Sequence, residues 1–501
     1  MSRESGVPAE SNLKRYPLIQ EVSTSLKAPE AFDLLKDRPF SFFLDSGMDP
    51  ETLGRYSFMG SDPFLVMKSR GGDISLLYRD RQETVTGNPF DVLGQMLEKY
   101  ALEPFHSPIP LIGGAVGYLS YDLCHFIERL PATAVDDLKL PECYLAFYDA
   151  IIAFDHLEGR AYIASTGFPE MEEASRRNRA RERIDELRDV LAGAPGPQTD
   201  SISKKAEVPC SGPAPGSKNA PGMKLRANFT HEEYVRAVAA AREYIYAGDI
   251  FQVNLSQRFD VDLHTDPYEL YRRLRLINPA PFACYLNFDD VTVAGASPER
   301  FLRLTEDLVE TRPMKGTRPR GRSAAEDDAL AGELLHSIKD RAENVMIVDL
   351  ERNDLGRVCR YGTVRVRELW TLERYATVFQ LTSTVEGRLR EGKNRTDLLK
   401  ASFPGGSITG APKVRAMEII DELEPTRRSI YTGSLGYLSF DGTMDLNIVI
   451  RTFIIKDGKA YFQVGGGIVS DSEPEAEYQE TMDKARALIE ALELSSFTEA
   501  E

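Results

Sequence analysis

The chain has 501 residues, of which 42% are hydrophobic and 28% are charged, and its formal net charge is −17. This length predicts two domains or one large composite domain with a sizeable core. Nucleic acids and anionic membranes repel so acidic a chain, so neither is expected as a partner, and an anionic substrate would need a local cluster of cations.

No apolar stretch approaches the ~20 residues that span a bilayer, and the N-terminal segment lacks the apolar region of a secretory signal. The five cysteines are scattered along the sequence. That usage is typical of a reducing compartment and argues against a disulfide framework or a zinc site. A cytoplasmic protein is therefore expected.

Residues 1–192 alternate short β-like runs with turns and end in a charged helix. The runs are Phe40–Leu44, Tyr56–Met59, Leu65–Lys68 and Tyr144–Phe154, and the helix is Met171–Leu191. Residues 193–224 are rich in Pro, Gly and Ser, a composition typical of a flexible linker.

Residues 225–495 open with Thr230–Glu233, which has the spacing of a capping box, followed by a helix through Tyr246. Further helices are expected near Ala331–Asp349 and after Pro412. The strands Ser434–Phe440, Asn447–Ile455 and Ala460–Val464 follow, with Asp457-Gly458 as a hairpin turn. Runs of strands and runs of helices, without regular βαβ alternation, favour an α+β fold.

Two pairs of acidic residues, Asp340 with Glu343 and Glu477 with Glu480, are each spaced three apart on an expected helix. This spacing places both carboxylates on one helix face. Two such pairs facing each other could hold Mg²⁺ with several of its waters. A solvated acidic face is the commoner explanation of the spacing alone.

Two glycine-rich segments are candidate anion sites. Phe403–Lys413 runs directly into a helix, whose first N–H groups attract anions, and Lys413 and Arg415 add positive charge. Gly465–Gly467 follows an expected strand and would let backbone donors approach a carboxylate closely. For each segment the alternative is an ordinary turn.

Lys315 lies among Arg312, Arg318 and Arg320. Neighbouring cations disfavour the ammonium form and lower the pKa of a lysine, which is one way to obtain a neutral, nucleophilic amine. The alternative is a basic loop that attracts anions.

Together these segments resemble the chorismate-utilising enzymes along nearly the whole chain. The resemblance implies two large antiparallel β-sheets packed as a sandwich with helices outside, and strands from both halves of the chain. The matching blocks are Gly54–Phe64, Gly113–Asp122, Ser297–Phe301, Lys315–Gly321, Asp340–Val358, Phe403–Pro425 and Gly465–Thr481.

Two positions point to a branch of the family. Gln252 stands where the isochorismate and salicylate branch has a lysine that activates water, and Lys315 stands where anthranilate synthases usually have alanine. The chain thus resembles enzymes that aminate chorismate to 4-amino-4-deoxychorismate, the precursor of p-aminobenzoate and folate, through a covalent lysine intermediate. An anthranilate synthase component is the alternative. A non-catalytic subunit that binds chorismate or tryptophan is a remote one.

The resemblance also assigns roles. Lys315 is the expected nucleophile and Glu299 the general acid. Glu343 and Glu480 are expected to bind Mg²⁺, with Asp340 and Glu477 acting through water. Ammonia is expected from a separate glutamine amidotransferase subunit, because no cysteine lies in a Gly-x-Cys-x-Gly turn. The expected substrate-binding residues are Gln252, Ser407, Thr409, Tyr437, Arg451, Gly465, Gly466, Gly467 and Lys484.

Two departures from the family pattern stand out. Gln380 occupies a position at which many members have histidine. The segments Leu44–Ser46 and Asn278–Ala283 differ from the tryptophan-site motifs of feedback-inhibited anthranilate synthases, so feedback inhibition by tryptophan is not expected.

Overall fold

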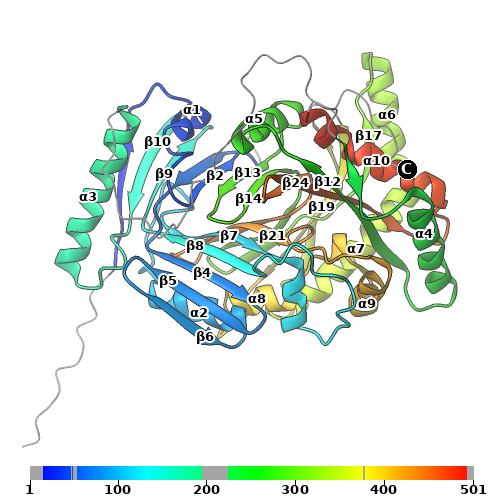
Figure 1. The fold of residues 1–501 in the computed structure, drawn as a ribbon, viewed down its shortest axis with the longest axis horizontal. Helices are drawn as coiled ribbons and strands as arrows, with labels where there is room; N and C mark the ends of the chain where they lie inside the picture. Colours follow the sequence, from blue (N-terminus) through cyan, green and yellow to red (C-terminus); the bar gives the residue numbers. More distant parts are fainter. Residues whose placement is uncertain (1–14, 47, 49–52, 194–223, 376–377, 493–501) are drawn as a thin grey trace, which may run out of the picture.

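The computed structural model describes residues 15–46, 48, 53–193, 224–375 and 378–492, so the expected linker lies outside the described residues except at its two ends. In the described part of the chain, the strands form two twelve-stranded sheets in which neighbouring strands run antiparallel. The helices lie around them (Figure 1). The expected α+β class and the two-sheet architecture are confirmed.

The first sheet takes one block of strands from each half of the chain, and the blocks meet where β2 pairs with β13. The short strand β20 (Gly410–Ala411) pairs with β12 off the main path. In spatial order the sheet is β1 (Leu18–Val22), β10 (Arg160–Ser165), β9 (Ala150–Asp155), β3 (Tyr56–Gly60), β2 (Ser41–Asp45), β13 (Phe282–Asn287), β14 (Thr292–Ser297), β23 (Thr452–Lys456), β24 (Lys459–Ile468), β12 (Gln252–Asp262) and β11 (Arg226–Ala227).

The second sheet is divided in the same way, and its blocks meet where β21 pairs with β7. We call these two junctions, β2–β13 and β7–β21, the seam. The strand β18 (Arg365–Arg374) pairs with β19 off the main path. The order is β17 (Met314–Pro319), β19 (Val378–Arg388), β16 (Leu308–Thr311), β15 (Arg300–Thr305), β22 (Met444–Ile448), β21 (Ser434–Ser439), β7 (Gly114–Leu119), β8 (Cys143–Tyr148), β4 (Leu65–Arg70), β5 (Asp73–Tyr78) and β6 (Gln82–Thr86).

The core has two main layers. Alternate side chains of the first sheet point to opposite faces: Phe42 packs into the cluster shared with the second sheet, and Phe43 packs under helices on the outer face. In Figure 1, α3 covers one end of the first sheet, α5 lies over its middle, and α10 lies toward the other end, against β24. The helices are α1 (Ala28–Asp33), α2 (Pro89–Lys99), α3 (Glu173–Leu191), α4 (His231–Tyr246), α5 (Pro267–Ile277), α6 (Ala324–His336), α7 (Ile338–Gly356), α8 (Arg395–Ser402), α9 (Lys413–Leu423) and α10 (Pro474–Ala491), with 3₁₀ turns η1 (Tyr121–Phe126) and η2 (Gly406–Ile408).

Helix α4 begins as the sequence predicts. The Thr230 hydroxyl accepts a hydrogen bond from the Glu233 N–H, and the Glu233 carboxylate accepts one from the Thr230 N–H. This reciprocal capping box satisfies two donors that the first turn of a helix leaves free. The expected helix near 331–349, in contrast, is two helices, α6 and α7, separated at Ser337, whose side chain caps α7.

The apolar run Tyr144–Phe154 is not one strand but two, β8 in the second sheet and β9 in the first, separated at Asp149. The Asp149 carboxylate is buried and pairs with Arg179 at 3.0 Å and Arg183 at 3.3 Å, both on α3. A buried charge requires such partners. The ion pairs therefore fix the point at which the chain crosses between sheets.

The last strands also differ from expectation. The segment Asn447–Ile455 is divided between β22 and β23 around Arg451, whose φ is 53°. The expected strand Ala460–Val464 continues through the glycines as β24, and the Asp457-Gly458 hairpin that precedes it is confirmed.

Helix α7 packs against β19, and its neighbour β18 carries the single tryptophan of the chain. The Arg341 guanidinium of α7 lies 3.6 Å from the centroid of the Trp370 ring. This cation–π contact joins the helix that carries Asp340 and Glu343 to the sheet.

Within the described residues, no helix combines the length and the apolar character needed to cross a membrane.

Candidate active site

Lys315 lies on β17 at a bulge. Its pairing with β19 is interrupted between Lys315 and Thr317, and the intervening Gly316 has a φ of 78°, a conformation that favours glycine. A β-carbon at Gly316 would also lie 2.9 Å from the Asp340 carboxylate carbon. The bulge therefore sets the direction of the lysine and brings β17 against α7.

Lys315 lies close to residues from the other sheet. A β-carbon at Gly467 would lie 3.3 Å from Lys315 Nζ and 2.3 Å from Gln252 Nε2. Gln252 begins β12, and Gly467 pairs with Asn254 of the same strand. Because β17 belongs to the second sheet, and β12 and β24 belong to the first, the candidate site lies between the two sheets.

Burial lowers the pKa of Lys315, since the surrounding protein removes water from the ammonium form, and the nearby Lys484 lowers it further. The sequence predicts a lowered pKa for Lys315, and the structure agrees. The predicted cause, repulsion by the neighbouring arginines, is not the one that the structure gives. The three neighbouring arginines are each paired with carboxylates: Arg312 with Glu373, Arg318 with Glu333 and Asp340, and Arg320 with Asp327.

Glu299 follows β14 and precedes β15, so it lies where the chain passes from the first sheet to the second. It is only 5% exposed, and burial raises its pKa to about 7, against the opposing effects of the Ser407 hydroxyl and the Lys315 ammonium. Glu299 Oε1 has no hydrogen-bond partner in the part of the chain that the structure describes. A carboxyl group in this environment can hold a proton near neutral pH.

The four predicted metal-binding carboxylates come from two helices. Burial raises the pKa of Glu343 on α7 and of Glu477 on α10, and the charge of Glu480 raises both further. Glu477 Oε2 lies 3.2 Å and Glu480 Oε1 3.6 Å from where a β-carbon at Gly466 would stand. The two carboxylates of α10 therefore both border Gly466 of β24.

Carboxylate oxygens are ligands that a hard divalent cation prefers, and the buried Glu477 Oε2 has no hydrogen-bond partner among the residues that the structure describes. They do not form a closed cage: no three His, Cys, Asp or Glu side chains among the described residues converge on one metal position. Two are already paired, Asp340 with Arg318 at 3.1 Å and Glu480 with Lys484 at 2.7 Å, and the Lys484 contact lowers the pKa of Glu480.

Arg451 is suited to an anionic ligand. Burial lowers the pKa of its guanidinium, and among the described residues it has no ion pair or hydrogen bond from its side chain. Arg451 is partly buried, and a partly desolvated cation without an ion-pair partner favours the binding of an anion. Lys484 on α10 is a second candidate cation, and its ammonium donates to the Gly465 carbonyl at 2.9 Å.

The remaining predicted contacts are mixed. Gln252 Oε1 and Ser407 Oγ are buried, have no partner within the described ranges, and can therefore meet a ligand, whereas the Thr409 hydroxyl donates to the Gly405 carbonyl at 2.9 Å. Gln380 lies on β19 opposite Thr317, and its Oε1 is also buried without a partner. Buried polar atoms in native proteins are nearly always paired, so this concentration of unpaired ones is typical of a polar ligand site.

Tyr437 is not placed with the other predicted residues. Its ring packs against Phe58 and lines a cavity of about 380 Å³ at the seam. Leu44–Ser46 and Pro281–Ala283 line the same cavity, so the two segments compared with the tryptophan-site motifs do meet.

The tyrosine beside Arg451 is Tyr431, which sequence reasoning missed; each side chain influences the pKa of the other. A usable signal existed. In the β21–β22 hairpin Ser434 pairs with Ile448, and three more steps in that register place Tyr431 opposite Arg451.

A model of the chorismate binding enzymes matches residues 56–490. The chain belongs to this family. Among curated relatives it is 41% identical to anthranilate synthase component 1 of Acetivibrio thermocellus, over 95% of each chain. It is also 41% identical to aminodeoxychorismate synthase component 1 of Bacillus subtilis, over 88% of this chain and 90% of that one.

Solved structures agree with this membership. Anthranilate synthase component I from Streptococcus pneumoniae superposes with a TM-score of 0.72 at 32% identity, covering 88% of this chain and 93% of that one. The menaquinone-specific isochorismate synthase MenF from Escherichia coli shares the fold, with a TM-score of 0.67 at 18% identity, over 96% of this chain and 95% of that one. The chain is thus a chorismate-utilising enzyme of the anthranilate and aminodeoxychorismate synthase type.

Proposed function

We propose that this enzyme aminates chorismate to 4-amino-4-deoxychorismate, using ammonia from a separate glutamine amidotransferase subunit. The observation that carries the proposal is the position of Lys315. Its amine, with a lowered pKa, lies beside Gln252 and Gly467 and interacts electrostatically with Glu299, Glu343 and Glu480. Overall similarity does not separate the two activities, because a relative of each kind is equally identical to this chain.

In the proposed reaction the neutral Lys315 amine adds to C2 of the chorismate ring while the C4 hydroxyl leaves, and Glu299 donates the proton that releases it as water. Ammonia then adds at C4 and displaces Lys315 as the free amine. The new C4 ammonium returns one proton to Glu299. Both residues are thereby restored, and two displacements retain the configuration at C4.

The substrate has two carboxylates, for which Arg451, Lys484 and the backbone of Gly465–Gly467 are the proposed partners. Mg²⁺ held by Glu343 and Glu480, with Asp340 and Glu477 through water, would supply positive charge beside the ring carboxylate. The raised pKa values of Glu343 and Glu477 support this assignment, because burial disfavours both carboxylates and, among the described residues, neither forms an ion pair within 4.0 Å.

The deciding experiment identifies the product formed from chorismate, Mg²⁺ and ammonium at mildly alkaline pH, by chromatography and mass spectrometry. Aminodeoxychorismate, converted to p-aminobenzoate by added lyase, supports the proposal. Anthranilate, which is fluorescent, would instead assign the enzyme to the second candidate activity, favoured by its 95% coverage of an anthranilate synthase component.

The role of Lys315 has its own test. Lys315→Ala and Lys315→Arg should both abolish aminodeoxychorismate formation, because the arginine keeps a positive charge but is not a nucleophile at neutral pH. Without ammonia, intact-protein mass spectrometry of the parent enzyme should show an adduct of chorismate minus water, which the variants lack. Parental turnover in Lys315→Ala would exclude the covalent step.

A further inference from the structure

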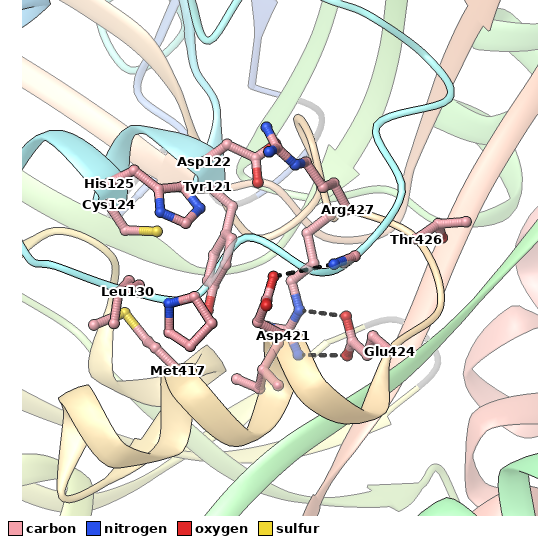
Figure 2. A pocket seen from close by; sticks show the side chains of 14 residues that line it. Tyr121, Asp122, Cys124, His125, Leu130, Met417, Asp421, Glu424, Thr426 and Arg427 are labelled. Atoms are coloured by element: carbon pink, nitrogen blue, oxygen red, sulfur yellow. Dashed lines mark hydrogen bonds and ion pairs between the residues drawn. The ribbon is translucent and has the colours of Figure 1, made fainter. Parts of the chain in front are cut away.

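Behind the candidate site lies a buried ion pair that the proposed reaction does not use. Glu424 follows helix α9, and Arg428 lies four residues later. Their side chains are 2% and 1% exposed, and they form two hydrogen bonds, at 2.7 and 2.9 Å. Figure 2 shows Glu424 beyond the last turn of this helix, with dashed lines marking these contacts.

Each partner also holds the backbone of an active-site element. Arg428 donates to the carbonyl of Asn254 on β12 at 2.6 Å and to the carbonyl of Ile408 at 2.9 Å. Glu424 accepts from the N–H of Ser256 at 2.9 Å and from its hydroxyl at 2.6 Å. A planar guanidinium can make such divergent contacts at once, and the ammonium of lysine cannot reproduce that geometry.

The two carbonyls that Arg428 joins are next to groups that face the substrate site. Ile408 follows Ser407, whose buried hydroxyl has no hydrogen-bond partner among the described residues. Asn254 lies two residues after Gln252, which adjoins Lys315. The same two segments are also tied by the Asn254 side chain, which donates to the Ser407 carbonyl at 3.1 Å.

The other end of the turn is held separately. Lys413 pairs with Asp354 of α7 at 2.5 Å and donates to the carbonyls of Ser402 and Pro404, both at 2.9 Å. Two cations, the buried Arg428 and the partly buried Lys413, thus hold residues 402–408 from opposite ends. Buried ion pairs add little net stability over apolar packing, so their geometry, more than their energy, distinguishes them.

We propose that Arg428 is a positioning residue: it fixes the separation between β12 and the turn at 406–409, and so sets where the unpaired Ser407 hydroxyl stands relative to Gln252 in the candidate site. The proposal rests on the proposed function only in that Glu299 and Lys315 carry the chemistry. It concerns how far Ser407 stands from them, whichever amination product is formed.

The test is a double-mutant cycle with Arg428→Lys and Ser407→Ala, in which the rate is measured as chorismate consumption. The matched control is Arg183→Lys, the same change at a buried arginine paired with Asp149, far along the chain on α3. Thermal unfolding of each variant measures its loss of stability. The rate loss of each variant can then be compared with the rate loss of the control relative to the stability that each has lost.

Arg428→Lys should lower kcat by about 100-fold and change KM for chorismate by less than about fivefold, since Ser407 moves relative to the reacting groups while Arg451 and Lys484, the proposed carboxylate partners, stay. The control should lose stability but keep kcat. If Arg428 acts through Ser407, the double variant should be no slower than the slower single variant.

Rate losses that multiply in the double variant, or equal losses in Arg428→Lys and the control, would overturn the proposal. Should Arg428→Lys fail to fold, Glu424→Gln takes its place in the cycle, because the amide can still accept from Ser256 while the charge that orients Arg428 is gone. Because the assay follows chorismate and not product, the finding of anthranilate would refute the proposed function without affecting this result.

Discussion

At the residue scale, burial shifts two groups of opposite type toward their neutral forms. It lowers the pKa of Lys315 and raises the pKa of Glu299 to about 7. In water the lysine would be an ammonium, which is not a nucleophile, and the glutamate would be a carboxylate, which has no proton to donate. The enclosed site therefore favours the reactive protonation states before any substrate binds.

The raised pKa of Glu299 has a measurable effect on stability. Its ordinary value is 4.5 and its folded value about 7, so between these pH values the folded state binds more protons than the unfolded state. Stability contributed by the neutral form is therefore lost as pH rises through this window. Glu299→Gln, which cannot ionise, should be more stable than the parent by up to about 3 kcal/mol at pH 8 and by little at pH 5.

Chemical denaturation at the two pH values measures this difference. Glu182→Gln, at an exposed position on α3, is the control and should show no pH-dependent gain. If Glu299→Gln and the parent enzyme were equally stable at pH 8, Glu299 would not be a neutral acid in the folded enzyme.

A second prediction at this scale concerns Glu480, whose side chain is 51% exposed and pairs with Lys484. Glu480→Gln removes one proposed ligand charge and should weaken Mg²⁺ binding at least about tenfold, together with Mg²⁺-dependent turnover. Calorimetric titration with MgCl₂ in the presence of chorismate provides the measurement. Glu475→Gln, on the same helix but paired with His231, should bind Mg²⁺ as the parent does.

At the element scale, the candidate site depends on β24, a strand with a segment whose sequence is typical of a turn. Three consecutive glycines indicate a loop, yet Gly465–Gly467 pairs with residues 254–256 of β12 as part of β24. Glycine is needed at position 467 because two side chains pack closely against the strand there: a β-carbon at Gly467 would contact Gln252 and Lys315. Sequence alone shows the glycines but not the side chains that exclude a larger residue.

Gly467→Ala should therefore separate fold from function. The methyl group would stand 2.3 Å from Gln252 Nε2, so the glutamine and the adjoining lysine must move. We expect kcat/KM to fall about 100-fold, with far-UV circular dichroism unchanged. Gly332→Ala in helix α6, where a β-carbon meets nothing within 4 Å, is the control and should remain fully active.

Elements with local signals were predictable. The capping box of α4, the Asp457-Gly458 hairpin and the three-residue spacing of the paired carboxylates all depend on near neighbours. The division of Tyr144–Phe154 into two strands was not predictable from the sequence. A run buried on both faces has no alternation of apolar and polar residues that would show where the chain changes sheets. Its marker is Asp149, whose arginine partners lie some 30 residues away on α3.

The candidate site divides in the same way. Motif resemblance brought together Lys315, Gln252, Gly467 and the carboxylates, and the structure places these near one another. The sequence prediction named Tyr437, which the structure places at the seam cavity, whereas Tyr431 lies beside Arg451. This difference follows from strand register, which a sequence determines only once both strands of the hairpin are known. The effect of burial on Lys315 likewise required the packing around it.

At the scale of the whole molecule, each sheet joins one block of strands from each half of the chain at the seam. Separated halves would expose the edges of β2, β7, β13 and β21, and unpaired edges of central strands aggregate. Residues 225–501 expressed alone should therefore be insoluble or inactive. Co-expression with residues 1–192 should restore a soluble complex that consumes chorismate.

Size-exclusion chromatography and the chorismate assay on the co-expressed pair check this expectation. A soluble and active 225–501 fragment would show that the seam is dispensable, and that the cavity of about 380 Å³ at the seam does not influence the catalytic half.

The contact between Trp370 and Arg341 gives the enzyme an intrinsic optical probe. Because the chain has one tryptophan, all indole emission comes from a ring 3.6 Å from the guanidinium of the helix that carries Asp340 and Glu343. If a ligand binds to those carboxylates and displaces α7, the quenching of the Trp370 emission changes. Stopped-flow fluorescence of the unlabelled enzyme can thus follow the first milliseconds of ligand binding.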